Sequence, residues 1–283
     1  MRTEKEMFAL FETIAASDDR VRVMTLEGSR VNPNVPADVW RDYDITFLVT
    51  DVGSFTGSDE WLAAFGELLL LQKPEAMELF PPDFPEGWFS YLMLFSDGVK
   101  IDLTLVPVAD IEHYFAQDPL IRVLLDKDSV CPELPPSSDE PFWIQKPNAA
   151  FVSDCANEFS FACTYAARGL LRNELLSANW TFEQIVRTEL LRMLDYLAGV
   201  RNGFPLNTGK HDKFLPRLLS ASEREALSAT YRLDSVDAAW EALYVAMALF
   251  EETMAEVCGR LAYPCPDYVT RIRSYIEKMK MLK

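Results

Sequence analysis

A chain of 283 residues is long enough for one large domain or two medium ones, and its hydrophobic content of 49% and aromatic content of 12% exclude an intrinsically disordered protein. No apolar run reaches the roughly 18 residues that a membrane span needs, and the N-terminus enters an amphipathic pattern rather than a signal segment. We therefore expect a cytoplasmic protein without a membrane partner. The formal charge of −17 argues against a nucleic-acid partner and favours a polycationic small molecule, although acidic surfaces also serve solubility.

The cysteines and histidines do not suggest a redox or zinc centre. The five cysteines are an odd number and include no Cys-x-x-Cys pair. Cys155 and Cys163, eight residues apart, could face one side of a helix, but we expect them to be buried free thiols rather than a bridge. Only His113 and His211 are available, which poorly supports a zinc site or a histidine-based catalytic triad.

The first half of the chain mixes helical and extended patterns. Apolar spacing predicts a helix over residues 3–16 and a strand over residues 20–27 that ends at Gly28 and Ser29. We then expect a loop or broken helix over residues 30–41, a strand over residues 44–49 and a helix over residues 58–71. A proline-rich excursion over residues 80–88 follows, and residues 89–95 and 99–106 form a two-stranded hairpin around Asp97-Gly98.

The second half has a different character. Residues 131–147 contain five prolines and are the best candidate for a linker. After it, helical apolar spacing recurs over residues 151–176, 182–197, 222–231, 236–261 and 268–281. The sequence therefore predicts an α+β protein with a small mixed sheet flanked by helices in residues 1–130 and a helical bundle in residues 148–283.

An Asp-x-Asp pair, Asp42 and Asp44, opens the strand expected over residues 44–49. In a strand the period of two places both carboxylates on the same face, where they repel each other unless a cation neutralises them. Mg²⁺ is the natural candidate because it takes hard oxygen ligands and pairs with substrate phosphates. Upstream, Gly28 and Ser29 form a small turn with a hydroxyl and free N–H groups suited to phosphate oxygens. Taken alone, each feature could be a solvated strand end or an ordinary turn.

A third carboxylate, Asp102, lies inside the second arm of the expected hairpin. A buried carboxylate without a partner would be expensive in so apolar a strand. A local hydrogen bond or an exposed edge strand would explain it. We prefer the interpretation that its strand lies beside the Asp-x-Asp strand, which makes Asp102 the third member of an acidic triad.

The Gly-Ser turn followed by Asp-x-Asp resembles the signature of polymerase-β-like nucleotidyltransferases, and nearly the whole chain resembles the aminoglycoside 6-adenylyltransferases that modify streptomycin. The similarity is carried by blocks that begin at residues 1, 28, 42, 51, 101, 155, 187, 207 and 263, such as GSRVNPN and NTGKHDK. The resemblance implies an N-terminal nucleotidyltransferase domain and a helical domain that completes the nucleotide and substrate cleft. It also implies transfer of AMP from ATP to a streptomycin hydroxyl, with Mg²⁺, by an enzyme that we expect to be a monomer. Thr188, where a proline is common, leaves the substrate range open.

In this interpretation Asp42 and Asp44 hold Mg²⁺, while Ser29 and the backbone around Gly28 contact the β- and γ-phosphates. Arg41 either adds a cation to the triphosphate or pairs with an aspartate. Asp102 either completes a second metal site or takes the proton from the attacking hydroxyl.

Three residues of the helical half are further candidates. Lys210 and Lys213, on a glycine-containing loop, would contact phosphates or be merely solvated. Glu158 would bind a substrate guanidinium, act as an alternative base, or be an ordinary surface glutamate. The rival functions are transfer to another cationic antibiotic or a protein side chain, and a non-enzymatic nucleotide-binding module.

Overall fold

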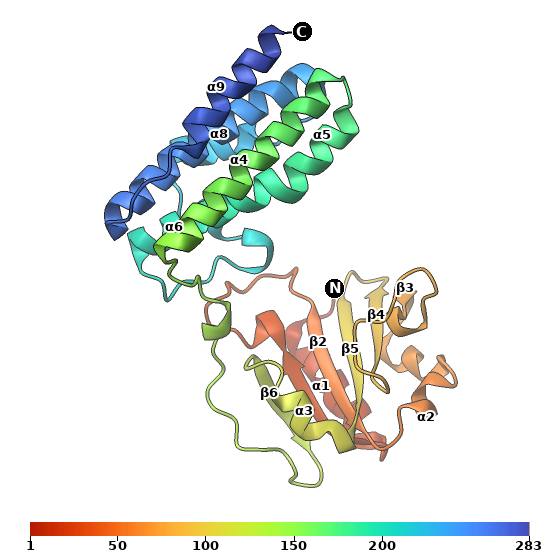
Figure 1. Ribbon diagram of the computed structural model, residues 1–283. Helices are drawn as coiled ribbons and strands as arrows, with labels where there is room; N and C mark the ends of the chain where they lie inside the picture. The colour runs from red at the N-terminus through yellow and green to blue at the C-terminus, as the bar shows by residue number, and fades with distance from the viewer. Residues whose placement is uncertain (283) are drawn as a thin grey trace. The chain divides into compact units, whose positions relative to one another are not determined.

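The structure, a computed structural model, describes residues 1–282. Those residues divide into two compact units between Asp139 and Glu140, within the proline-rich segment 131–147. The first unit contains a mixed sheet with helices and the second is helical (Figure 1). The predicted α+β fold class is confirmed.

Within residues 1–282, the sheet has six strands in the order β3-β4-β5-β2-β1-β6. The strands are β1 (Val21–Glu27), β2 (Tyr43–Val49), β3 (Leu68–Gln72), β4 (Phe89–Phe95), β5 (Lys100–Pro107) and β6 (Ile121–Asp126). β2 and β5 are parallel neighbours, and every other neighbouring pair is antiparallel. The hairpin predicted around Asp97-Gly98 is confirmed as β4 and β5, with Gly98 at a φ of +84° that favours glycine.

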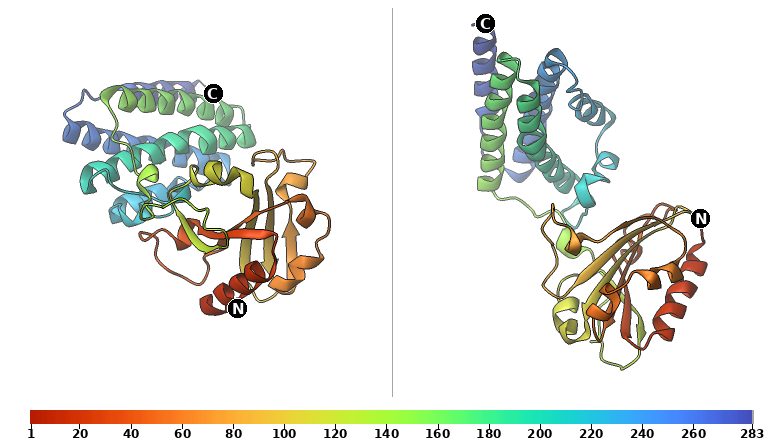
Figure 2. Two further views of the ribbon diagram at one scale, coloured as in Figure 1. Left: turned by 90° about the horizontal axis from the view of Figure 1, so that it is seen from below. Right: turned by 90° about the vertical axis from the view of Figure 1, so that its right-hand side faces the viewer.

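Each face of the sheet is covered by a different helix. The helices of this unit are α1 (Glu4–Ser17), α2 (Gly53–Thr56) and α3 (Ile111–Phe115). α1 begins with a capping box between Thr3 and Glu6, and it packs its buried side chains against the larger hydrophobic cluster of the sheet. Tyr114 of α3 packs on a smaller cluster that includes Leu48 and Val106. α1 and α3 therefore lie on opposite faces (Figure 2).

One predicted helix of the first half is wrong. Residues 58–71 form a short 3₁₀ helix, Glu60–Phe65, followed by the edge strand β3, which pairs with β4. Gly66 separates them at a φ of +128°, a backbone conformation that favours glycine and ends the helix. The leucine run 68–71 is compatible with the period of a helix and with that of a strand, so pairing with β4 decided its structure. α3 and β6 lie in a stretch where the sequence predicted no element.

The second unit consists of α4 (Ala149–Leu171), α5 (Leu175–Thr181), α6 (Arg187–Asn202), α7 (Ala221–Ala229), α8 (Val236–Leu261) and α9 (Tyr268–Met281). Its core includes the stacked rings of Phe159 and Phe250, whose centroids are 3.9 Å apart. The helix predicted over residues 151–176 ends early, at Leu171. Asn173 then adopts a φ of +62°, which turns the chain into α5, and a π-helical turn, Phe182–Val186, joins α5 to α6.

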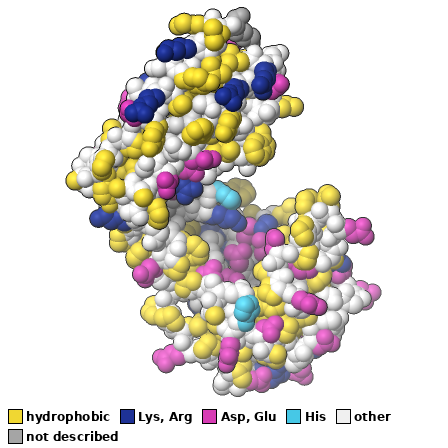
Figure 3. Space-filling model, in the orientation of Figure 1, with side chains coloured by type: hydrophobic (Ala, Val, Ile, Leu, Met, Phe, Trp, Pro, Cys, Tyr) yellow, Lys and Arg dark blue, Asp and Glu magenta, His cyan; other side chains and the backbone are white. Residues whose placement is uncertain are grey.

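The five cysteines are free thiols, and Cys155 and Cys163 are buried as predicted. Among the helices of residues 1–282, none is long and apolar enough to cross a membrane. On the face drawn in Figure 3, Asp and Glu side chains are scattered over the first unit.

Candidate active site

The pairing of β2 with β5 brings the predicted carboxylates together. The two strands are parallel and Asp44 lies directly beside Asp102 in register. Tyr43 and Ile45, which flank Asp44, point into the larger cluster under α1, so Asp44 projects from the opposite face. Asp42 precedes β2 by one residue and shares that face. The expectation that the two acidic strands are neighbours is correct.

Lys100 completes this group, and the sequence interpretation missed it. Its Nζ donates to Oδ2 of Asp42 at 2.6 Å and to Oδ2 of Asp102 at 2.7 Å. Lys100 and Asp102 are two residues apart on β5, as Asp42 and Asp44 are along the chain, so four side chains project from one face of the sheet in two rows. The Lys-x-Asp spacing was the available signal. We call these four residues the carboxylate square.

Arg30 fixes the backbone that carries Asp42. Its Nε donates to the Asp42 carbonyl at 2.8 Å and one terminal nitrogen donates to the Arg41 carbonyl at 2.7 Å. Its guanidinium carbon lies 3.6 Å from the centroid of the Tyr43 ring, a cation–π contact. The irregular segment predicted before Asp42 is therefore held in place by a side chain from the turn after β1.

The Gly28-Ser29 turn meets the square at Asp44. Gly28 has a φ of +66°, and a Cβ there would come within 2.6 Å of Oδ2 of Asp44, so only glycine fits. Of the N–H groups expected to be free in this turn, that of Gly28 is not free: it donates to the Leu120 carbonyl at 3.1 Å as β1 continues its pairing towards β6. Gly28 therefore permits close approach to a carboxylate. Ser29 follows it in the same turn.

Arg41 points back towards that turn. One of its terminal nitrogens donates to the Ser29 carbonyl at 3.3 Å, while its buried Nε has no hydrogen-bond partner. Arg41 forms no ion pair with the part of the chain that the structure describes, which leaves its charge available to an anionic ligand.

Burial and repulsion perturb the acidic residues. Burial, followed by the charges of Asp102, Glu27 and Asp42, raises the pKa of Asp44 to about 6. Burial also raises the pKa of Glu27, which accepts hydrogen bonds from Thr46 and Tyr114. Burial acts to lower the pKa of Lys100, but its hydrogen bonds to Asp102 and Asp42 outweigh it, and the net shift is upward. The square thus contains more negative charge than its one lysine neutralises.

The donor set suits a hard divalent cation. Carboxylate oxygens are the ligands that Mg²⁺ prefers, and Oδ1 of Asp102 is buried without a hydrogen-bond partner. As they stand, however, residues 1–282 contain no group of three acidic, His or Cys side chains arranged to hold a metal.

The second unit contains a separate pocket of about 660 Å³, and Glu158 lines it. Of the acidic residues in its lining, the sequence interpretation had named only Glu158. The acidic and aromatic side chains that gather there are Asp154 and Glu158 from α4, Glu189, Asp195 and Tyr196 from α6, and Phe142, Trp143 and Phe151. On α4 the available signal was the spacing of four between Asp154 and Glu158, which keeps both on one helix face. Glu189 and Asp195 are six residues apart on α6, which places them about 120° apart around the helix, so their spacing gave no such signal.

The carboxylates of this pocket differ in how they are neutralised. Glu189 pairs with Arg192 at 2.9 Å, so its charge is balanced locally. Asp195 has one buried oxygen, Oδ1, without a hydrogen-bond partner. Burial, with the nearby Asp212 carboxylate, raises the pKa of Asp195 to about 7. Such a pocket suits a cation with an apolar body, which would pair with Asp195 and stack on the rings.

Lys210 and Lys213 do not line the acidic pocket of their own unit. Both are exposed, and the Nζ of Lys213 lies 5.0 Å from the centroid of the Phe214 ring. Their loop is closely packed at Gly209, where a Cβ would lie 2.8 Å from Phe214. Thr208, at the start of this loop, lines the acidic pocket.

Comparison with known proteins defines the class of enzyme. The family model described as streptomycin adenylyltransferase matches residues 1–279. The chain is 45% identical over 278 residues to the aminoglycoside 6-adenylyltransferase of Bacillus subtilis (strain 168), covering 98% of both chains. It is 46% identical over 280 residues to the Campylobacter jejuni protein of that name, covering 99% of this chain and 96% of the relative.

A crystal structure of an aminoglycoside 6-adenyltransferase from Bacillus subtilis is 41% identical, covers 99% of each chain and superposes with a TM-score of 0.49. A carboxylate-lined sheet in a chain with these relatives is that of an adenylyltransferase, so the predicted enzyme class is confirmed. The chain belongs to the streptomycin adenylyltransferase family.

Proposed function

We propose that this enzyme transfers AMP from ATP to the 6-hydroxyl of streptomycin in a reaction that needs Mg²⁺ and releases pyrophosphate, and so confers aminoglycoside resistance. The observation that carries the proposal is the carboxylate square on the parallel strands β2 and β5, in a chain whose relatives are named aminoglycoside 6-adenylyltransferases. A protein that only bound a nucleotide would have little need for three crowded carboxylates.

The first unit would bind the nucleotide. Asp42, Asp44 and Asp102 would hold Mg²⁺, which when bound offsets the negative charge of the triphosphate. Ser29 and the unpaired Nε of Arg41 would donate to phosphate oxygens, and Gly28 keeps the turn close to Asp44. Asp102 either shares the metal or accepts the proton of the attacking hydroxyl, for which it must come within about 3 Å of that group.

The acidic pocket of the second unit would bind a guanidinium group of the acceptor. Glu158 and Asp195 supply negative charge, and Tyr196 supplies an aromatic face. Lys210 and Lys213 remain candidates for phosphate contacts on the strength of their loop alone.

Pyrophosphate release from ATP tests the reaction directly. It should require both streptomycin and Mg²⁺, and it should fall to background when either is omitted. Release with a different cationic antibiotic instead would keep the reaction and change the acceptor. No release with any cationic acceptor, despite ATP binding, would contradict the proposal.

Asp42→Asn tests the site assignment. We expect the transfer rate to fall by a factor of about 100 to 1,000, since the substitution removes a carboxylate that acts on the transferring group. Asp83→Asn, at an exposed loop position, is the matched control and should retain full activity. A near-normal rate for Asp42→Asn would show that the metal-site assignment is wrong.

A further inference from the structure

Lys100 is the member of the carboxylate square to which the proposed reaction gives no role. Its ammonium lies between two carboxylates, 2.6 Å from Asp42 and 2.7 Å from Asp102. The side chain is 39% exposed, so the lysine is not trapped there by packing and can leave by rotating its flexible stem.

The oxygens that hold Lys100 are those that would bind a metal ion. Mg²⁺ takes oxygen ligands at about 2.1 Å, so a cation bound to Oδ2 of Asp42 and Oδ2 of Asp102 would fall on the position of the ammonium. The two cations cannot occupy this place together. The buried Oδ1 of Asp102, which has no hydrogen-bond partner, shows that the lysine leaves part of the acidic site unsatisfied.

We propose that Lys100 is the resident counter-ion of the Asp42–Asp102 pair and that a divalent cation binds by displacing it. The inference rests on the metal site of the proposed function. While Lys100 is in place, it relieves the repulsion between the carboxylates. When displaced, it stays tethered to β5 beside the site, where its free ammonium can meet the anionic nucleotide. Metal affinity is thus set by competition with a side chain of the protein itself.

Mn²⁺ binding without nucleotide, measured by calorimetry or electron paramagnetic resonance, tests the competition. Lys100→Met should bind Mn²⁺ about tenfold more tightly than the wild type, because two ion pairs no longer have to be broken. Lys73→Met is the matched control: Lys73 pairs with Asp59 at 2.8 Å and is 34% exposed, but it lies outside the square. Equal affinity of the wild type and Lys100→Met would overturn the competition alone. No binding to either would overturn the metal site as well.

A second measurement uses the unmodified protein and separates displacement from a long-range effect of charge. Acetic anhydride acetylates free amines, and mass spectrometry of peptides reports each lysine. Adding Mg²⁺ without nucleotide should raise the acetylation rate of Lys100 severalfold and leave that of Lys73 unchanged. If Mg²⁺ leaves the Lys100 rate unchanged or lowers it, the lysine is not displaced and the proposal fails.

Discussion

At the scale of single residues, the position of a carboxylate determines its chemistry. Asp44 and Asp195 are both aspartates whose pKa is raised by burial, to about 6 and about 7 respectively. The second cause differs: other carboxylates of the square act on Asp44, and Asp212 acts on Asp195. A bound cation would therefore stabilise the ionised carboxylate of each residue, in place of the solvent that burial has removed.

We expect Asp195 to make binding of the proposed cationic acceptor depend on pH. A cation favours ionised Asp195, so the affinity for streptomycin should rise as the pH increases through about 7. Asp195→Asn should bind more weakly at pH 8 and lose this dependence, as measured by calorimetry between pH 6 and pH 8. Asp234→Asn, exposed and outside the pocket, should behave as the wild type.

The dependence of folding stability on the protonation of Asp195 provides the control for folding in this experiment. The pKa of Asp195 is higher in the folded state than in the unfolded chain, so the folded state binds more protons between about pH 4 and pH 7 and loses stability as the pH rises through that range. Asp195→Asn should therefore be as stable as the wild type or more stable at pH 8. Weak binding by a destabilised Asp195→Asn protein would argue against a direct contact with the cation.

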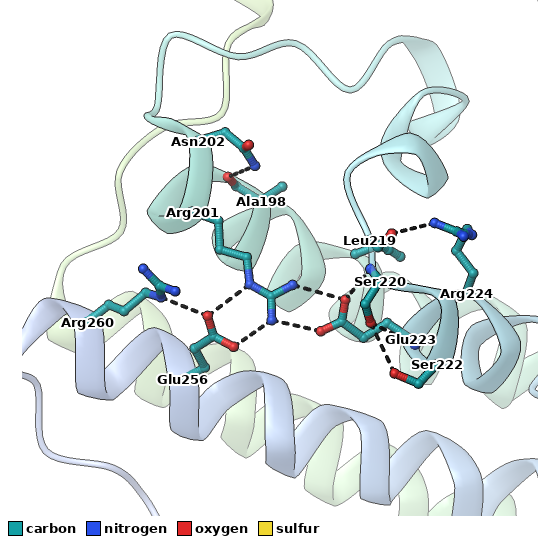
Figure 4. A network of polar contacts seen from close by, with 10 residues as sticks. All are labelled: Ala198, Arg201, Asn202, Leu219, Ser220, Ser222, Glu223, Arg224, Glu256 and Arg260. Carbon is teal, nitrogen blue, oxygen red and sulfur yellow. Dashed lines mark hydrogen bonds and ion pairs between the residues drawn. The ribbon is translucent and has the colours of Figure 1, made fainter.

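At the scale of elements, one arginine joins three helices of the second unit (Figure 4). Arg201 of α6 donates to Glu223 of α7 at 2.8 and 3.0 Å, and its Nε donates to Glu256 of α8 at 2.9 Å. Arg260 also donates to Glu256, at 2.7 Å. Glu223 closes the capping box at the start of α7 with Ser220, so the network fixes the beginning of a helix as well as its neighbours.

Removing Arg201 should destabilise the helical unit. Arg201→Ala leaves two partly buried carboxylates facing each other, and we expect the free energy of unfolding to fall by about 2–3 kcal/mol. The matched control is Arg271→Ala: Arg271 of α9 pairs at 2.8 Å with Asp267, the residue that precedes the helix, but both side chains are well exposed, so the change should stay within about 0.5 kcal/mol. Urea denaturation measures both. Equal losses in the two variants would show that the network adds nothing beyond a surface ion pair.

Some of these elements could be predicted from the local sequence pattern and others could not. The hairpin of β4 and β5 was predictable because Asp-Gly suits a tight turn and the flanking runs are apolar. The edge strand β3 was not, because a run of leucines is compatible with a helix or a strand until a partner strand pairs with it. α3 is only five residues long, too short to show a period.

At the scale of the whole molecule, the charge of −17 should guide a cationic acceptor towards the protein. We expect kcat/KM for streptomycin to fall severalfold when KCl is raised from about 50 to about 300 mM, because salt screens long-range attraction. Osmotically matched sucrose is the control and should have little effect. A kcat/KM that does not change with salt would show that the net charge serves only solubility.

The sequence by itself determined the family, through motif blocks spread along the chain, and the α+β class, through patterns within single segments. It also supplied Asp42, Asp44 and Asp102 as candidate site residues, because the residue type and local spacing of carboxylates can be read without a fold. Tertiary structure alone decided that Lys100 lies between Asp42 and Asp102, since this contact depends on the register of β2 against β5 and joins residues 58 positions apart. It likewise decided that Asp195 and Glu158 share a pocket, because the packing of α4 against α6 is not encoded in the spacing along either helix.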